Sequence, residues 1–527
     1  MISSNGTNGN GGGSATTVRD PDTDRARLRA VHGALTSGDI IAAGKLAEDA
    51  LADGIDHPMV LNLVAGRREE QGRLDEALVL LQRALAAAPE AIGVMNAIGL
   101  VLSRQSRFEA AAASFGDALA REPRFAPALA NRGMALLALG REAEALADFE
   151  GAAAVDPDNL IALDGLAALA LRRGAAAEAR ELAARVLARE PGWPGAVLTL
   201  AGADLAEGKP EAAEAALAAL LGDARLAPVD RALAIGLRGD ALDALGRHAE
   251  AFAAWGGANK LEEARYRGDY AARPGTLALV RSLTVALGGQ RVAAAWGHGG
   301  RSPAKRHVFL IGFPGSGAAE LEAALAAQPD VLMLPGAEAL VDATREWLAD
   351  ADRIARFCAL DDEALEPLRE AYWRRVAERG VDPVGKVFVD SNAFNIFKLP
   401  LIARLFPDAR VILARRDPRD AVLAAFRARL PMSDPAWQLL SLEGTAALYA
   451  ATMALVEASE AAFGLFLHVA GREQVLADPG GEMKALADFI GLPRGGALSA
   501  PASWTGEVGR WQDHEDALAP VLPLLAP

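Results

Sequence analysis

The chain has 527 residues, of which 51% are hydrophobic and 23% are charged, and its formal net charge is −15. A chain of this length and hydrophobic content can bury more than one core, so we expect two structural halves. The acidic balance argues against nucleic acid as a partner, because binding to a phosphate backbone requires a basic face.

The chain begins with a polar segment. Residues 1–22 are rich in Gly, Asn, Ser and Thr, a composition that predicts a disordered tail. A single cysteine, Cys358, leaves no partner for an intrachain disulfide, and acidic residues and arginines interrupt the apolar runs before they reach the length of a membrane span. We therefore expect an intracellular, cytoplasmic protein without a membrane span.

A pattern with a period of 34 residues, the interval from Pro89 to Pro123, follows the tail. A glycine or serine that closes a turn, an alanine that allows close helix packing and a proline that ends a helix each recur at this interval. Each unit is therefore predicted to be a helical hairpin. The recurring positions are Pro89, Pro123, Pro157 and Pro191, then Gly72, Ser106, Gly140, Gly174 and Gly208, and Ala77, Ala111, Ala145, Ala179 and Ala213.

The period, the turn and the terminal proline resemble the tetratricopeptide repeat (TPR). The resemblance implies an α-helical solenoid of about seven hairpins over residues 23–270, with a last turn at Gly246 that is out of step with the others. Arrays of this kind bind a protein or an extended peptide, which we expect in the concave face. Because such an array is a binding scaffold, any chemistry is expected in the other half of the chain.

Residues 271–304 are predicted to be a linker, after which short apolar runs alternate with helices. Continuous apolar strands separated by helices indicate a parallel sheet covered on both faces. We therefore expect an α/β domain over residues 305–527, with ligands at the carboxyl ends of its strands. The predicted strands are residues 307–313, 387–390, 410–414 and 465–469, and the predicted helices cover 318–328, a segment that ends at 405, 417–430 and 481–490.

The first predicted strand ends in a glycine-rich loop, Gly-Phe-Pro-Gly-Ser-Gly, at residues 312–317. Its glycines allow backbone N–H groups to converge on an anion at the start of a helix. Ala318 and Ala319 stand where a nucleotide P-loop has a lysine and a hydroxyl residue, which disfavours a metal-dependent phosphate-transfer enzyme. The alternative is that the loop is only a turn.

Arg415 and Arg416 follow the third predicted strand, directly before the helix start Asp417-Pro418. A guanidinium group in this position can extend over the edge of the sheet towards a phosphate. Arginine pairs are also common on solvated faces and in salt bridges, which is the alternative interpretation.

Together these segments resemble the sulfotransferase family. Bacterial sulfotransferases with TPR arrays in front have the same layout. The resemblance implies transfer of a sulfuryl group from 3′-phosphoadenosine 5′-phosphosulfate (PAPS) to an acceptor hydroxyl, without a metal. The segments that carry it are residues 308–331, 406–420, 476–479, 489–493 and 509–511, which cover nearly all of 305–527.

The resemblance also implies roles for individual residues. Glu338 lies near the family's acceptor-activating glutamate, two residues late, and is the candidate catalytic base; the alternative is an exposed loop acid. The 5′-phosphosulfate is expected at the loop, the 3′-phosphate at Arg416 and at position 424, and a further cofactor contact at Arg510. The cofactor-binding residues so implied are Pro314, Gly315, Ser316, Gly317, Ala318, Ala319, Arg416, Ala424 and Arg510.

Several positions depart from the family pattern. The family loop, Pro-Arg/Lys-Ser-Gly-Thr-Thr, here lacks one cation and two hydroxyl groups, a lysine near the bridging oxygen is absent, and so are two serines. Because a hydrogen bond to a charged group contributes about 1.5–3 kcal/mol, the loss of three or four costs roughly 5–10 kcal/mol. The departures are Gly315, Ala318, Ala319, Ser391, Ala424 and Glu507, and the cations near them are Lys398, Arg415, Arg419 and Arg510.

Two functions therefore stay open. One is a PAPS-dependent sulfotransferase whose acceptor is presented by the TPR array. The other is a pseudoenzyme, a non-catalytic interaction scaffold with a degenerate sulfotransferase-like domain. His307, His468 and His514 have no spacing that suggests a metal site or a catalytic triad, so we expect structural roles for them.

Overall fold

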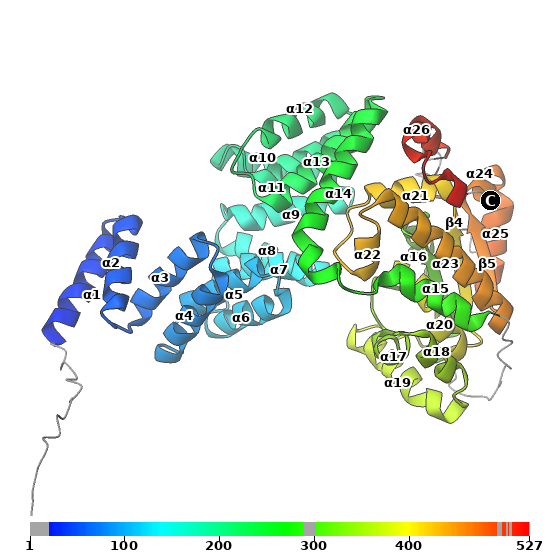
Figure 1. Cartoon of the computed structure of the whole chain (residues 1–527), viewed down its shortest axis with the longest axis horizontal. Coiled ribbons are helices and arrows are strands. Elements are labelled where there is room, and N and C mark those ends of the chain that lie inside the picture. Colours follow the sequence, from blue (N-terminus) through cyan, green and yellow to red (C-terminus); the bar gives the residue numbers. More distant parts are fainter. Residues whose placement is uncertain (1–20, 289–301, 493–497, 502–503, 505–507, 526–527) are drawn as a thin grey trace, which may run out of the picture. The chain divides into compact units, whose positions relative to one another are not determined.

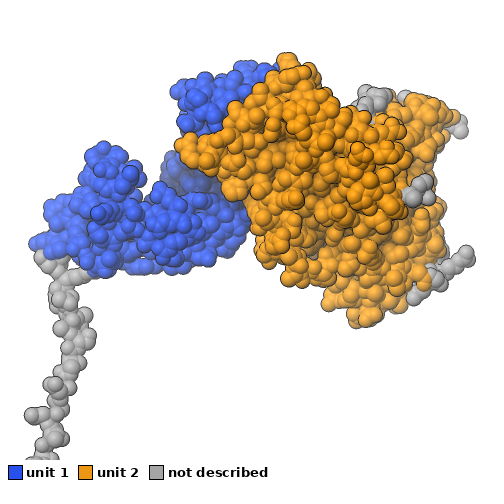
Figure 2. Space-filling view, turned by 45° about the horizontal axis from the view of Figure 1, so that its top comes forward, with its two compact units in different colours: residues 1–203 blue, residues 204–527 orange. Residues whose placement is uncertain are grey.

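The computed structural model describes residues 21–288, 302–492, 498–501, 504 and 508–525. It divides into two compact units, residues 1–203 and 204–527 (Figure 2). The predicted tail at residues 1–22 lies almost entirely outside the described residues. In the part of the chain that is described, no helix has both the length and the apolar character needed to cross a membrane.

The first unit is a run of helices (Figure 1), as the 34-residue period predicts. Successive helices pack in pairs, from α1 with α2 to α9 with α10. The helices are α1 (Pro21–Thr36), α2 (Ile40–Ala52), α3 (Pro58–Glu70), α4 (Leu74–Ala87), α5 (Ile92–Arg104), α6 (Phe108–Arg121), α7 (Ala126–Ala138), α8 (Glu142–Val155), α9 (Leu160–Arg172) and α10 (Ala176–Arg189), and α11 (Pro194–Ala206) begins in this unit.

The turn residues have the backbone conformation that their role requires. Gly72 has φ of 74°, Gly140 has 72°, and Ser106 takes the same left-handed region at 59°. An L side chain is disfavoured there, which explains why glycine dominates this position. Pro89 and its equivalents follow the last residues of the second helices, as predicted.

Small residues in the repeats make room for aromatic rings. The ring of Phe149 is fully buried between two helical glycines, Gly133 and Gly165. A Cβ atom would come within 2.6 Å of the ring at Gly133 and within 2.4 Å at Gly165. Both distances are shorter than any ordinary carbon–carbon contact, so these positions exclude even alanine unless the ring moves.

Replacement of Gly165 by alanine should therefore destabilise the repeats by about 1–3 kcal/mol through overpacking. Gly66 is the matched control, because it is also helical and a Cβ there meets no atom within 4 Å. Gly66→Ala should raise stability by about 0.5–1 kcal/mol, since alanine is the better helix former. Chemical denaturation followed by circular dichroism measures both; equal stability of the two variants would contradict the packing argument.

The second unit joins helices to one parallel sheet. Its helices are α12 (Pro210–Leu221), α13 (Pro228–Ala244), α14 (His248–Tyr270), α15 (Gly275–Leu287), α16 (Ala318–Ala326), α17 (Val341–Trp347), α18 (Ala351–Cys358), α19 (Asp362–Glu378), α20 (Leu399–Leu405), α21 (Pro418–Arg427), α22 (Asp434–Gln438), α23 (Leu442–Phe463), α24 (Arg472–Ala477), α25 (Pro479–Ile490) and α26 (Glu515–Leu518). The strands are β1 (Arg306–Gly312), β2 (Val331–Pro335), β3 (Val387–Ser391), β4 (Arg410–Arg415) and β5 (Phe466–Gly471), and short 3-10 helices are η1 (Ala393–Lys398), η3 (Arg510–His514) and η4 (Leu522–Leu524).

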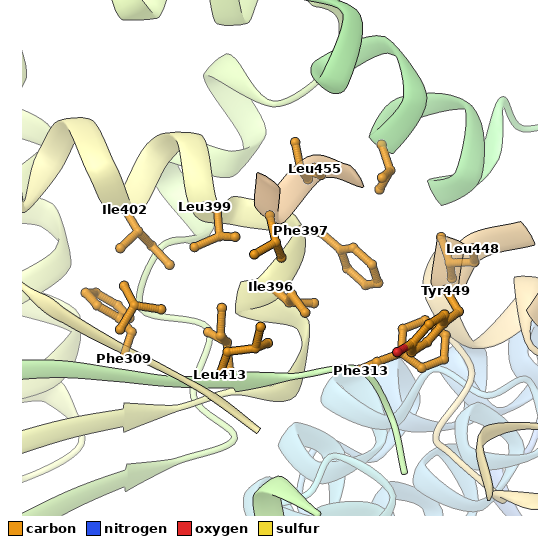
Figure 3. Close-up of a cluster of buried hydrophobic side chains, with 14 of the residues drawn as sticks. Phe309, Phe313, Ile396, Phe397, Leu399, Ile402, Leu413, Leu448, Tyr449 and Leu455 are labelled. Carbon is orange, nitrogen blue, oxygen red and sulfur yellow. The ribbon is translucent and has the colours of Figure 1, made fainter. Parts of the chain in front are cut away.

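The strand order is β2-β3-β1-β4-β5, and every pairing is parallel. Alternate residues of each strand point to opposite faces, and both faces are buried. Phe309 and Leu413 pack under α20 and α23 in one core, part of which Figure 3 shows. Leu310 and Ile412 pack in the other core with side chains of α16 and α25. The predicted fold class, a helical solenoid followed by a parallel α/β sheet, is confirmed.

The helices directly before the sheet belong to its core. Trp255 of α14 and Val280 and Leu283 of α15 are buried in the same cluster as the sheet residues. Asn259 of α14 donates a hydrogen bond to the carbonyl of Phe426 at 3.0 Å. The range 271–304, predicted as a linker, thus contains a packed helix, because the apolar face of α15 was overlooked in the sequence. The bounds 23–270 and 305–527 and the number of hairpins stay predictions.

Two further details differ from the sequence analysis. The structure has a fifth strand, β2, whose short apolar run Val-Leu-Met-Leu was not assigned as a strand, because so short a run fits a helix segment as well as a strand. Helix α21 ends at Arg427 instead of residue 430, because Ala428 adopts an extended backbone conformation.

Candidate functional site

A cavity of about 940 Å³ opens at the carboxyl ends of the strands. Its wall includes residues that directly follow each strand: Phe313 after β1, Gly336 after β2, Asn392 after β3, Arg416 after β4 and Arg472 after β5. This is the edge where parallel sheets bind their ligands.

The glycine-rich loop forms one wall of this cavity. Gly315 and Gly317 have φ of 80° and 95°, and Ser316 donates its backbone N–H to the carbonyl of Phe313 at 2.9 Å. Helix α16 begins directly after Gly317, so N–H groups that lack an intrahelical acceptor lie beside the cavity. Of the six residues at 314–319 that were predicted to bind the cofactor, Ser316 alone is absent from the cavity lining, and the other five contribute to it.

Gly315 leaves little space for a side chain. A Cβ atom at this position would lie 2.7 Å from the Cβ atom of Ala424 and 3.1 Å from the backbone nitrogen of Ala425. The predicted cation of the family loop therefore has no room here, and Ala424 lines the cavity with a methyl group. Ser316 is 3% exposed, and within the described residues its Oγ atom has no hydrogen-bond partner.

Arg416 is brought directly against the loop. Its side chain is 3% exposed, and Nη1 donates to the carbonyl of Gly315 at 3.2 Å. Its Nη2 atom lies 3.6 Å from Asp420, whose carboxylate also accepts the backbone N–H groups of Gly509 at 2.7 Å and Trp511 at 2.8 Å. The loop and Arg416, far apart in the chain, thus face one cavity.

The cavity carries more positive than negative side chains. Arg416, Arg427, Arg429 and Arg472 line it, against three carboxylates, Asp240, Glu320 and Glu338. In a chain with a formal net charge of −15, this local balance is favourable for an anion. The sequence analysis missed Arg427, Arg429 and Arg472; the position of Arg472 directly after a strand was the available signal.

Glu338 lies on the cavity wall and its side chain is half-exposed. Its carboxylate accepts a hydrogen bond from Asn392 at 2.9 Å and forms an ion pair with the buried Lys398 at 2.5 Å. The predicted base is thus held in a defined orientation by residues of the segment that follows β3. Lys398 brings an ammonium group to the region where Ser391 replaces the family lysine.

A buried polar network lies behind this segment. Tyr372 donates to the carboxylate of Asp390 at 2.9 Å, Asn395 donates to the same carboxylate at 2.9 Å, and His307 lies 3.0 Å from the Tyr372 hydroxyl. Burial raises the pKa of Asp390 to about 7, and it lowers the pKa of His307 to about 3. His307 is buried in this network, and its structural role stays a prediction.

The raised pKa of Asp390 predicts a pH-dependent stability. In the unfolded chain this carboxyl group ionises near pH 4. Its contribution to the free energy of unfolding is therefore fully present below about pH 4 and is lost as the pH rises through about 7. In Asp390→Asn this fall, up to about 4 kcal/mol for a shift of three pKa units, should be absent. Urea unfolding of both proteins between pH 4 and pH 8 measures the difference; parallel pH profiles would contradict it.

Two other predicted cations lie away from the cavity lining in the described structure. Arg510 forms an ion pair with Asp243 of α13 and lies 3.4 Å from Asp513. Arg419 pairs with Asp417 at 2.5 Å and lies over the ring of Trp511. Neither arginine is in the lining of the cavity, and the predicted role of Arg510 as a cofactor contact stays a prediction. Glu507 lies outside the described residues.

Asp243 is the centre of a polar cluster that the sequence did not reveal. Its carboxylate lies 2.8 Å from His248 and 2.9 Å from His514, and the three side chains could hold a metal ion by distance alone. The guanidinium groups of Arg510 and Arg427 form ion pairs with the same carboxylate. Despite burial, hydrogen bonds from the two histidines and the charge of Arg510 hold the pKa of Asp243 well below its usual range. Two cations at this carboxylate disfavour a metal, so the cluster joins η3 to α13 and α14.

Comparison with known protein families finds two matches. Residues 307–495 match the family model described as the sulfotransferase family, and residues 126–159 match the model of the tetratricopeptide repeat. The protein therefore combines a tetratricopeptide repeat with a sulfotransferase-family domain. No curated protein matched the chain.

Similar solved structures include TPR proteins. One from Parabacteroides merdae is 19% identical, with a TM-score of 0.35, and the match covers 46% of this chain and 93% of that protein. A thermophilic TPR protein from Thermus thermophilus, TTC0263, is 26% identical, with a TM-score of 0.29 and coverage of 34% and 99%. YrrB, described as a TPR protein with an unusual peptide-binding site, is 18% identical, with a TM-score of 0.27 and coverage of 40% and 96%.

Proposed function

We propose that the C-terminal domain is a sulfotransferase that uses PAPS as its donor and transfers the sulfuryl group to a hydroxyl of an acceptor bound by the repeats. One observation carries this proposal: the glycine-rich loop and the buried Arg416 face a single cavity with an excess of arginine side chains. The match of residues 307–495 to the sulfotransferase family supports the choice of donor.

The residues present fit the donor only in part. The loop retains the glycine conformations and the start of α16, which together favour a 5′-phosphosulfate group. Arg416 is fixed beside the loop, where it would hold the 3′-phosphate. The lost hydroxyl groups at Ala318 and Ala319 have no replacement on the loop itself, so the arginines of the cavity wall must supply the remaining attraction.

Glu338 is the proposed general base. The acceptor oxygen forms a bond to sulfur, the bond from sulfur to the bridging oxygen breaks, and the leaving adenosine 3′,5′-bisphosphate keeps that electron pair. The proton of the acceptor hydroxyl passes to the carboxylate of Glu338. Asn392 and Lys398 hold this carboxylate in place, and Lys398 adds a positive charge near the reacting groups.

The repeats are proposed to bind the acceptor, a protein or a peptide, in their concave face. This follows from the match to the tetratricopeptide repeat and from the general use of such arrays for binding extended peptides. A small-molecule acceptor is the alternative for the same cavity. In either case the acceptor hydroxyl must reach Glu338.

A non-catalytic domain is the second candidate function, and the packing around Gly315 favours it. Ala424 and Ala425 occupy the space that the family cation would need, so the loop cannot regain it by a single substitution. In this case the domain would serve as a docking part of an interaction scaffold, and the cavity would bind no nucleotide.

Titration calorimetry of the full chain with adenosine 3′,5′-bisphosphate distinguishes these functions. We expect saturable binding for the sulfotransferase, because this product shares both phosphate groups with the donor. No heat at millimolar ligand would leave the non-catalytic scaffold as the function. Where binding is seen, incubation with PAPS carrying labelled sulfur shows whether the label moves to a protein acceptor.

A further inference from the structure

Arg472 lies beside Arg416 at the carboxyl edge of the sheet. Strands β4 and β5 are parallel neighbours in which Arg415 pairs with Gly471, so each of the two arginines is the first residue beyond that pair. Neighbouring strands are about 4.8 Å apart, so the two side chains start from adjacent backbone positions. Both line the same cavity.

Both guanidinium groups are almost completely removed from solvent. The exposed fraction of the side chain is 3% for Arg416 and 2% for Arg472. Arg416 has Asp420 at 3.6 Å, and Arg472 has the half-buried Glu320 at 3.7 Å. Two buried cations that line one cavity have lost most of their hydration, so an anion that contacts both is favoured.

Other contacts fix the positions of both side chains. Arg416 donates to the carbonyl of Gly315, and Arg472 lies 5.4 Å from the ring centroid of the fully buried Trp504. The backbone N–H of Asp417 donates to Glu473 at 3.0 Å, which ties the segment after β4 to the segment after β5. The spacing between the two arginines is therefore set by the sheet and not by flexible loops.

The cavity that Arg472 lines also includes a position where a phosphate contact is missing. Ala424 occupies the place of the serine that the family resemblance assigns to the 3′-phosphate, and a methyl group donates no hydrogen bond. A phosphate monoester carries a charge of about −1.5 to −2 at neutral pH. Two guanidinium groups match this charge and offer several donors in a planar fork.

We propose that Arg472 and Arg416 form a two-arginine site for the 3′-phosphate of the donor nucleotide, and that Arg472 selects nucleotides that carry this group. The inference rests on the proposed function, because it assigns one end of the nucleotide to one end of the cavity. Arg472 is a specificity-determining residue in this account, and it replaces the serine that is lost at Ala424.

The test compares two nucleotides on the full chain by calorimetry. Adenosine 3′,5′-bisphosphate and adenosine 5′-monophosphate differ by the 3′-phosphate alone. The selectivity ratio, which is the dissociation constant of the monophosphate divided by that of the bisphosphate, therefore reports recognition of this group. Arg472→Gln should weaken binding of the bisphosphate roughly 10- to 150-fold, the effect of one lost charged contact. Binding of the monophosphate should stay within about twofold, since it has no group at this site.

Two further variants keep the test decisive. Arg419→Gln is the matched control, because Arg419 pairs with Asp417 outside the cavity lining, and its ratio should equal that of the wild type. Arg472→Lys keeps the charge but loses the planar fork, so its ratio should lie between the wild type and Arg472→Gln. The lysine variant also serves if the glutamine variant fails to fold.

The outcomes separate the two levels of the proposal. If the wild type binds the bisphosphate but both Arg472 variants have the same ratio of dissociation constants as the wild type, the role of Arg472 is overturned and the proposed function stands. If the wild type binds neither nucleotide, both are overturned. A lower ratio in the Arg472 variants, with an unchanged ratio in Arg419→Gln, supports the two-arginine site.

Discussion

Arg416→Ala should reduce binding of adenosine 3′,5′-bisphosphate by roughly 10²–10⁴-fold. The guanidinium group is buried at the end of β4 and is fixed against the loop. Its removal takes away a charged contact with two donors, and no other side chain occupies the same position. Titration calorimetry on the wild type and the variant measures the loss.

The control for Arg416→Ala is a test of whether the variant is folded. After the substitution, the carboxylate of Asp420 still accepts hydrogen bonds from the backbone N–H groups of Gly509 and Trp511, so we expect the variant to fold. Circular dichroism and thermal unfolding show whether the variant is folded. A folded Arg416→Ala protein with the wild-type dissociation constant would show that the nucleotide, if bound, does not contact this arginine.

Glu338→Gln should lower turnover by about 10²–10⁴-fold while nucleotide binding stays close to that of the wild type. The amide keeps the size of the side chain but accepts no proton, and the residue contacts Asn392 and Lys398 and neither of the two buried arginines in the contacts described above. Transfer of labelled sulfur from PAPS measures turnover, and calorimetry measures binding on the same sample.

Glu363→Gln is the matched control for Glu338→Gln, because Glu363 is an exposed glutamate at the start of α19. Its turnover should equal that of the wild type. Equal turnover in Glu338→Gln would remove Glu338 as the base and leave it as a partner of Lys398.

Much of the fold was predictable because strong local patterns determine it. The 34-residue recurrence of proline, glycine and alanine predicted the helical repeats, since each position has one physical role. The apolar runs of β1 and β4 are buried on both faces, so their strand character was clear. Strand β2 was missed because its run of four apolar residues does not distinguish a strand from part of a helix. Helix α15 was missed because its place in the core becomes clear only from its packing against α23.

The site was predictable only where sequence neighbours carry it. The loop and Arg416 each follow a strand directly, so parallel pairing was sufficient to bring them together. Arg472 also follows a strand directly, but the predicted strand ended at residue 469, before the end of β5 at Gly471, so the arginine was missed. The pair of Glu338 with Lys398 depends on side-chain direction, which a single sequence does not reveal. The contact of Arg510 with Asp243, a residue 267 positions earlier in the chain, was likewise beyond a single sequence, and its role as a cofactor contact stays a prediction.

A crystal structure of the full chain with adenosine 3′,5′-bisphosphate tests the central claim most directly. The account predicts the nucleotide in the cavity at the carboxyl ends of the strands, with the 5′-phosphate at residues 314–319 and the 3′-phosphate in contact with Arg416. A nucleotide bound elsewhere on the protein, or a cavity that stays empty at saturating nucleotide, would contradict it.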